Sequence, residues 1–149
     1  DCLPVLFADP QDRAVAAAHA GWRGLAGEGG RGILEETHAR LAAVGSGDTL
    51  VWLGPCIGPS AFEVGDDVKA AFESVDAGAA ALFRPHATAG KWLADLQGLA
   101  RRRLAALGIT RIYGNDGSDA WCTVGNPSRF FSHRRDRVSG RFAACIWLA

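Results

Sequence analysis

The sequence has no excess of charge of either sign, no long apolar run and no closely spaced pair of cysteines. Sixteen Lys and Arg residues balance sixteen Asp and Glu residues in 149 positions, so no overall field attracts nucleic acid or a membrane surface. The longest apolar runs are far shorter than the roughly 20 residues that a membrane-spanning helix needs. We therefore expect no nucleic acid and no membrane among the partners.

The cysteines give no sign of a disulfide framework. Cys2, Cys56, Cys122 and Cys145 are widely scattered, and no CxxC pair occurs. An even number of cysteines permits disulfides, but this spacing favours free thiols in a cytoplasmic protein.

Length and composition favour one compact domain. Hydrophobic residues make up 48% and charged residues 21% of the chain, which is ordinary for a globular protein that buries a real core. We expect a single domain over residues 1–149 and a monomer. The chain opens with Asp-Cys-Leu-Pro-Val, inside an apolar run and without Met. This start predicts the C-terminal major part of a longer domain, whose N-terminal part is missing.

Hydrophobic periodicity predicts a mixture of strands and helices. Alternating residues predict a first strand at 2–8, and its turn-linked partner of small residues follows at 14–18. An antiparallel first hairpin argues against a purely parallel sheet. The remaining predicted strands are 50–53, 110–113 and 142–148, and the predicted helices lie between Gly24 and Gly45, over 64–75 and over 93–107. The polar stretch 114–141 is long and irregular, which is typical of loops that serve a site.

The first hairpin brings a cysteine and a histidine together. A four-residue turn at 9–12 would set Cys2 opposite His19, with Cβ atoms roughly 5 Å apart. Thiolate and imidazole both bind Zn²⁺ well. On the other face this register pairs Leu3 with Ala18, and the same large-against-small pattern continues along the two strands.

Other interpretations of this pair stay open. A buried thiol beside a hydrogen-bonded imidazole is the commoner arrangement, and a Cys–His pair also suits nucleophilic catalysis. Two ligands are too few for a catalytic zinc, which has three protein ligands and an open position.

Three arginines are candidates for anion binding. Arg23 follows His19-Ala20-Gly21-Trp22 and precedes Gly24. The glycines on either side of Arg23 would let the backbone approach a ligand. Arg134 and Arg135 lie in the long polar stretch, and guanidinium groups match phosphate well. The alternatives are a surface arginine for Arg23 and a solvated charge cluster for the other two.

Four segments together resemble the YfiH-like family. They are "DCLPVLFAD", "HAGWRGLAGEGGRGILEET", "WLGPCIGPSAFEVGDDV" and "FFSHRRDRVSGRFAACIWLA", and they occur in order across the whole chain. Members have been described as purine nucleoside phosphorylases with adenosine deaminase activity, and earlier as multicopper polyphenol oxidases or laccases. The resemblance implies an α+β fold, a layered α/β/β/α sandwich with mixed sheets.

The resemblance also implies a site and an activity. Cys2 and His19 are then both metal ligands and catalytic residues, and a third ligand, a histidine, belongs to a segment upstream of this chain. The implied enzyme is a zinc-dependent phosphorylase of adenosine, inosine and methylthioadenosine, hence a transferase, with hydrolase activity as an adenosine deaminase. Purine nucleosides and phosphate are its substrates, and Arg23, Arg134 and Arg135 would bind phosphate.

Two other functions remain as alternatives. Cys and His ligands would also accept copper, but multicopper oxidoreductase chemistry needs many histidines and this chain has four. A non-catalytic metal-binding interaction module would require a site closed by four protein ligands, of which two are visible.

The remaining candidates carry weaker signals. We expect Cys56 to be structural or incidental, Cys145 to lie in the core on the last strand, and His133 to have no metal role. For Cys122 a packing role and a contact with substrate are equally open. Arg101, Arg102 and Arg103 fall outside the apolar stripe of their helix, so we expect all three in solvent.

Overall fold

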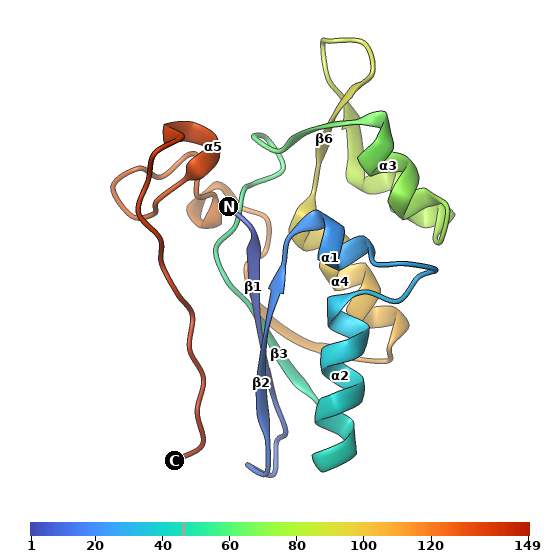
Figure 1. Ribbon diagram of the computed structural model, residues 1–149, viewed down its shortest axis with the longest axis vertical. Helices are drawn as coiled ribbons and strands as arrows, with labels where there is room; N and C mark the ends of the chain where they lie inside the picture. Colours follow the sequence, from blue (N-terminus) through green and yellow to red (C-terminus); the bar gives the residue numbers. More distant parts are fainter. Residues whose placement is uncertain (46) are drawn as a thin grey trace.

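A four-stranded mixed sheet forms the centre of the molecule. The computed structural model describes residues 1–45 and 47–149. The strand order is β2-β1-β3-β7, in which β1 is antiparallel to β2 and β3, and β3 is parallel to β7 (Figure 1). The prediction of an α+β fold with mixed sheets is therefore confirmed. The strands are β1 (Leu3–Ala8), β2 (Val15–Ala20), β3 (Leu50–Leu53) and β7 (Arg111–Gly114).

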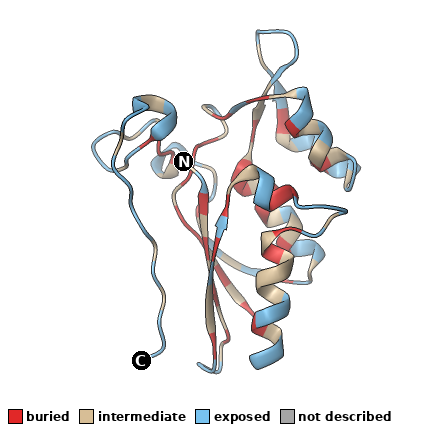
Figure 2. Ribbon diagram, viewed as in Figure 1, coloured by how far each residue is buried: buried red, intermediate tan, exposed pale blue. Residues whose placement is uncertain are grey.

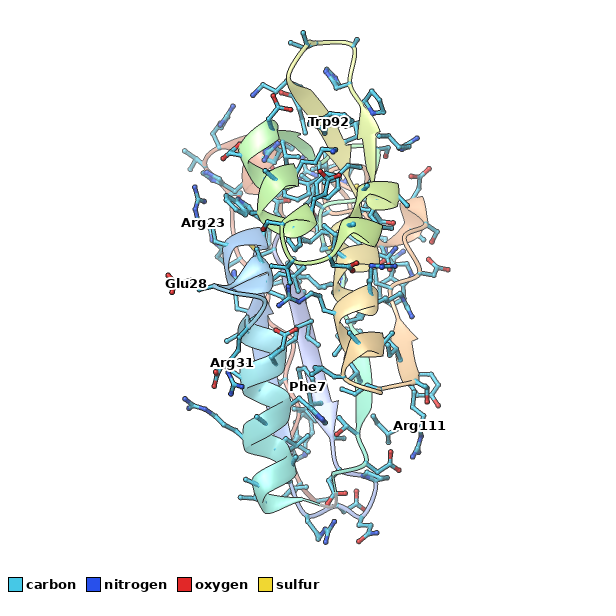
Figure 3. The ribbon with its side chains drawn as sticks, turned by 90° about the vertical axis from the view of Figure 1, so that its right-hand side faces the viewer. Phe7, Arg23, Glu28, Arg31, Trp92 and Arg111 are labelled. Atoms are coloured by element: carbon cyan, nitrogen blue, oxygen red, sulfur yellow. The ribbon has the colours of Figure 1, made fainter. Side chains whose placement is uncertain are left out.

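Helices cover one face of this sheet. They are α1 (Trp22–Ala26), α2 (Ile33–Val44) and α4 (Leu96–Ala106), and all lie on the same side of the strands (Figure 1). Leu3, Val5 and Phe7 of β1 are fully buried towards them, and Phe7 lies between α2 and α4 (Figure 3). Buried residues follow the strands and the inner sides of the helices (Figure 2). The alternation of β1 thus places the core on one face and leaves the other face for the site.

A smaller antiparallel sheet lies beyond the end of the central one. Its order is β4-β6-β5, with α3 (Asp66–Glu73) and the 3-10 helix η1 (Ala77–Leu82) packed beside it. The strands are β4 (Glu63–Gly65), β5 (Phe83–Pro85) and β6 (Lys91–Ala94).

Two predicted helices began too early because each included one of these short strands. Val64 pairs with Trp92, and Leu93 pairs with Glu63, across the β4–β6 ladder. The helix α4 begins only after Asp95, whose carboxylate accepts the N–H of Gly98 at 2.9 Å and caps the helix.

The predicted register of the first hairpin is wrong by two residues. Pro4, rather than Cys2, faces His19, and Leu3 faces Ala20. The predicted turn is present, since the N–H of Asp12 donates to the carbonyl of Asp9 at 3.0 Å. However, the N–H of Asp9 donates to the carbonyl of Ala14 at 2.9 Å. Ala8 therefore faces Val15 instead of Arg13, and the connection between the two strands is two residues longer than predicted. A shift of two keeps every side chain on its predicted face.

The predicted strand at 142–148 is not formed. This segment is extended, on the opposite side of the sheet from the helices, and mostly exposed (Figures 1 and 2). Within the described part of the chain no strand pairs with it. Trp147 is 76% exposed, and Cys145 is exposed, so its predicted core position is also wrong.

Two of the three arginines predicted to lie in solvent instead make internal contacts. The Arg103 side chain is only 11% exposed and pairs with Glu35 at 2.8 Å, while its Nη2 donates to the carbonyl of Gly30. Arg101 donates to the carbonyl of Asn115 at 2.6 Å. Arg102 is exposed, as predicted, and pairs with Asp76.

Among the helices that the structure describes, none has the length and apolar character to cross a membrane.

Candidate metal and substrate site

Cys2 and His19 converge on the outer face of the first hairpin. Cys2 immediately precedes β1 and His19 is the fifth residue of β2; both side chains are exposed. They are diagonal neighbours, because Pro4 is the residue directly opposite His19. A Cβ atom added to Gly21 would lie 3.1 Å from Cys2 Sγ and 3.7 Å from His19 Nε2. The sulfur and the ring nitrogen therefore flank one small space, which the absence of a side chain at Gly21 leaves open.

A cavity of about 610 Å³ adjoins this pair. Its volume is within the range of small-molecule sites. One wall is the outer face of the hairpin, and the other is the C-terminal part of the chain. The apolar lining includes Pro4, Leu6, Ala17 and Phe131, and the polar lining includes Cys2, His19, His133, Ser139 and Arg141.

The donors present fit part of a metal site. A thiol and an imidazole nitrogen are both good ligands for Zn²⁺, and their convergence leaves room between them. Over residues 1–45 and 47–149, however, no group of three or more His, Cys, Asp or Glu side chains is placed to hold a metal ion. His133 lines the same cavity but does not complete such a group. The described residues thus offer two ligands of a site that needs at least three.

Asp1 lines the same cavity and was not among the predicted candidates. Its carboxylate accepts hydrogen bonds from the hydroxyls of Thr123 and Ser132, both at 2.7 Å, and from the N–H of Arg134 at 2.8 Å. The only signal in the sequence is an acidic residue directly before Cys2, and nothing in the periodicity indicates its distant partners.

Arg135 stabilises the loop that carries it. Its guanidinium donates to the carbonyls of Thr123, Val124 and Phe130, and pairs with Asp136 at 2.7 Å. The hydrogen bonds that Arg135 donates to the carboxylate of Asp136 raise the pKa of Arg135. Arg135 is not among the residues that line the cavity.

Arg134 and Arg23 are also outside the cavity lining. Arg134 donates through Nη1 to the carbonyl of Glu63 at 3.1 Å, and so connects its short helix, α5 (His133–Asp136), to β4. Arg23 lies over the ring of Trp22 at 4.3 Å and projects from α1 away from the other helices (Figure 3). The structure does not gather the three arginines, and their role in phosphate binding stays a prediction.

Cys56 and Cys122 are buried neighbours, and neither is among the residues that line the cavity. They form an isolated parallel bridge between two loops. Asn115 Nδ2 donates to Cys56 Sγ at 3.4 Å, and the N–H of Gly58 donates to Cys122 Sγ at 3.3 Å. Burial raises the pKa of the Cys56 thiol to about 12, so this thiol is protonated at neutral pH.

Comparisons with known proteins match the whole chain. Residues 1–149 match the family model described as multi-copper polyphenol oxidoreductase laccase. A purine nucleoside phosphorylase of Pseudomonas aeruginosa is 49% identical over 148 residues, covering 99% of this chain and 57% of the relative. The purine nucleoside phosphorylase YfiH of Escherichia coli is 51% identical, with coverages of 99% and 56%.

Solved structures agree with this match. A DUF152 protein of Neisseria meningitidis has a TM-score of 0.78 and 48% identity, covering 91% of this chain and 52% of that one. The YfiH protein of Bacillus licheniformis has a TM-score of 0.74 and 31% identity, with coverages of 92% and 50%. The chain spans about half the length of the relatives it matches.

Proposed function

Because the chain belongs to the multi-copper polyphenol oxidoreductase laccase family, which includes the YfiH-like purine nucleoside phosphorylases, we propose that it carries most of the active site of a zinc-dependent purine nucleoside phosphorylase. Its substrates are adenosine, inosine or methylthioadenosine together with phosphate, and adenosine deamination is a second reaction of the same site. The observation that supports this proposal most directly is the convergence of Cys2 Sγ and His19 Nε2 beside a cavity of nucleoside size.

Cys2 and His19 are the residues that would hold the zinc. When bound, zinc supplies Lewis-acid stabilisation of negative charge that develops on the substrate or on water. In deamination, water replaces the amino group at C6 of adenosine and ammonia leaves. In phosphorolysis, a phosphate oxygen forms a bond to C1′ of the ribose while the bond from C1′ to the base nitrogen breaks, and the released base takes up a proton.

The cavity walls provide apolar surface for the nucleoside. Leu6 and Pro4 provide an apolar surface on the hairpin, and Phe131, a residue that is 52% exposed, lines the same cavity. Aromatic and aliphatic surfaces of this kind suit the flat face of a purine.

Arg23 is the favoured phosphate-binding residue among the three candidates. Arg135 already donates to three carbonyls and to Asp136, and binding phosphate would break those contacts. Arg134 donates to the carbonyl of Glu63. Arg23 lies four positions after His19, on a helix that begins beside the Cys2–His19 pair.

We place the third metal ligand outside residues 1–149, so that the chain is the C-terminal major part of a longer single domain. Two facts support this placement: the described residues offer only two converging donors, and the relatives are nearly twice as long as the matched region. The four cysteines are free thiols, which is consistent with a cytoplasmic protein. We expect the whole protein to be a monomer.

Copper-dependent phenol oxidation is the second candidate, favoured by the description of the family model. One thiol and one imidazole suit copper as well as zinc. Metal analysis of the purified full-length protein distinguishes the two, since the first proposal requires zinc with turnover of inosine and the second requires copper with turnover of a phenol.

The proposal predicts the effect of removing either ligand. In the full-length protein, Cys2→Ala or His19→Ala should remove both bound zinc and phosphorolysis of inosine, because each deletes a ligand. Both side chains are exposed on the outer face of the sheet, so circular dichroism and the urea midpoint should change little. Cys145→Ala, at an exposed cysteine outside the cavity lining, is the matched control. Normal zinc content and normal phosphorolysis in either variant would show that the assignment is wrong.

A further inference from the structure

We infer that Asp1 is a positioning residue, which fixes Cys2 against the opposite wall of the cavity. Its carboxylate joins the start of β1 to two segments more than a hundred residues away. Oδ1 accepts the hydroxyls of Thr123 and Ser132, each at 2.7 Å, and Oδ2 accepts the N–H of Arg134 at 2.8 Å.

The backbone at Asp1 is fixed as well. The carbonyl of Asp1 accepts the N–H of Ile57 at 2.8 Å, and the carbonyl of Pro4 accepts the N–H of Gly54 at 2.9 Å. Cys2 lies between these two bonded carbonyls. The main chain that carries the Cys2 thiol is therefore held on one side by the segment after β3, and by the Asp1 carboxylate on the other.

The partners of the carboxylate are themselves rigidly placed. Thr123 is fully buried and Ser132 is 1% exposed. Ser132 Oγ also accepts the N–H of Arg135, so the same hydroxyl caps α5 and donates to Asp1. Phe131 and His133, on either side of Ser132, both line the cavity. A shift of Ser132 relative to Asp1 would thus change the distance between Cys2 and these two side chains.

A carboxylate suits this position better than an amide. Three donors point at its two oxygens, and an ionised carboxylate only accepts hydrogen bonds. Asparagine has one acceptor oxygen, and its NH₂ group would face a donor unless the hydroxyls of Thr123 and Ser132 rotate to accept. The amide can therefore replace the carboxylate only in part, whereas alanine removes all three bonds.

The consequence for metal binding rests on the proposed function, but the positioning itself can be measured without metal. The full-length protein would carry Cys145→Ser, which leaves Cys2 as the exposed cysteine among those described. Asp1→Ala, Asp1→Asn and Thr123→Val would be compared in this background. Asp48→Ala is the matched control, since it removes an aspartate whose partner Arg111 is exposed at the other end of the sheet.

Two measurements without metal decide the inference, and Co²⁺ binding tests its consequence for the proposed function. Asp1→Ala should raise the alkylation rate of Cys2 by iodoacetamide several-fold and the hydrogen-exchange rate of the Arg134 amide at least tenfold. It should also weaken Co²⁺ binding by about ten- to a hundredfold, as is typical when a partner that orients a ligand is removed. Asp1→Asn should restore part of each effect, Thr123→Val should give smaller changes in the same direction, and Asp48→Ala should give none.

Wild-type rates of Cys2 alkylation and Arg134 exchange in Asp1→Ala would overturn the inference, as would equal changes in Asp48→Ala. If Asp1→Ala fails to fold, Thr123→Val carries the same test with one bond removed. Failure of the proposed function appears separately, as a lack of Co²⁺ uptake by the unmodified protein, and the alkylation and exchange rates still decide the role of Asp1.

Discussion

Gly21 keeps open the space beside the two proposed metal ligands. Its backbone angles, φ −67° and ψ 158°, are ordinary for any residue, so Gly21→Ala should leave the fold intact. The added Cβ would lie 3.1 Å from Cys2 Sγ, which is closer than a comfortable contact and would displace the thiol. We expect zinc affinity of the full-length protein to fall by about tenfold, measured by competition with a chelator.

Gly24→Ala is the control for this prediction. A Cβ there would be 3.6 Å from the carbonyl of His19, an ordinary contact that does not reach the thiol. Unchanged zinc affinity in Gly21→Ala, or an equal loss in Gly24→Ala, would contradict the expected crowding at Cys2.

Cys56 makes the stability of the fold sensitive to alkaline pH. Burial raises its pKa from 9.0 to about 12, so between these values the unfolded chain releases the thiol proton while the folded chain keeps it. Its contribution to stability is fully present below pH 9 and is lost as the pH rises towards 12. The free energy of unfolding should fall with a slope approaching about 1.4 kcal/mol per pH unit.

Urea denaturation between pH 8 and pH 11 measures this slope, with Cys56→Ala as the comparison. The variant should be less stable at neutral pH, because it loses buried contacts, but its stability should decline less steeply. Parallel curves for the two proteins would show that Cys56 does not cause the alkaline loss.

At the residue scale, the sequence predicted the shared face of Cys2 and His19 because strand alternation survives a register shift of two. It did not predict the hydrogen bonds of Asp1, since local periodicity says nothing about a partner such as Ser132. It also failed for Arg103, because a position outside the apolar stripe of a helix can still be covered by another helix.

At the scale of elements, Arg103 connects α4 to α1, to α2 and to the segment between them. Its guanidinium pairs with Glu35 and donates to the carbonyls of Gly30 and Ala26. Arg103→Leu would leave Glu35 and these carbonyls without that donor, and we expect a loss of about 3 kcal/mol in the free energy of unfolding. Arg102→Ala, at the exposed neighbour, should change it little. Similar urea midpoints for the two variants would rule out this connecting role.

Element boundaries were predicted well where the apolar run in the sequence has the length of the buried strand, as in β1 and β3. The strands β4 and β6 were missed because Val64 and Leu93 are in phase with the apolar residues of the helices that follow them. The segment 142–148 shows the opposite failure: its composition is that of a strand, but a strand also needs a neighbour to pair with, and the described chain provides none there.

At the scale of the whole molecule, the two-ligand arrangement predicts different behaviour for the 149-residue chain and the full-length protein. The shorter chain should bind zinc weakly and turn over inosine negligibly, because a missing ligand removes both a bond and the geometry of the open position. Adding the remaining part, in cis or in trans, should restore zinc binding. Tight stoichiometric zinc in the 149-residue chain, measured by elemental analysis after dialysis, would place the third ligand within it.

The contact between Asp1 and Ser132 joins residues 131 positions apart, which has a consequence for the newly made chain. At about 5–20 residues per second, the ribosome needs roughly 7–26 s to reach Ser132 after it has made Asp1. During that interval the segment that carries the Cys2 thiol cannot form its contact with the loop around Ser132, because that loop has not yet been synthesised. The nascent protein is thus open to oxidants and to stray metal ions before its site is assembled, and translation speed sets the length of that exposure.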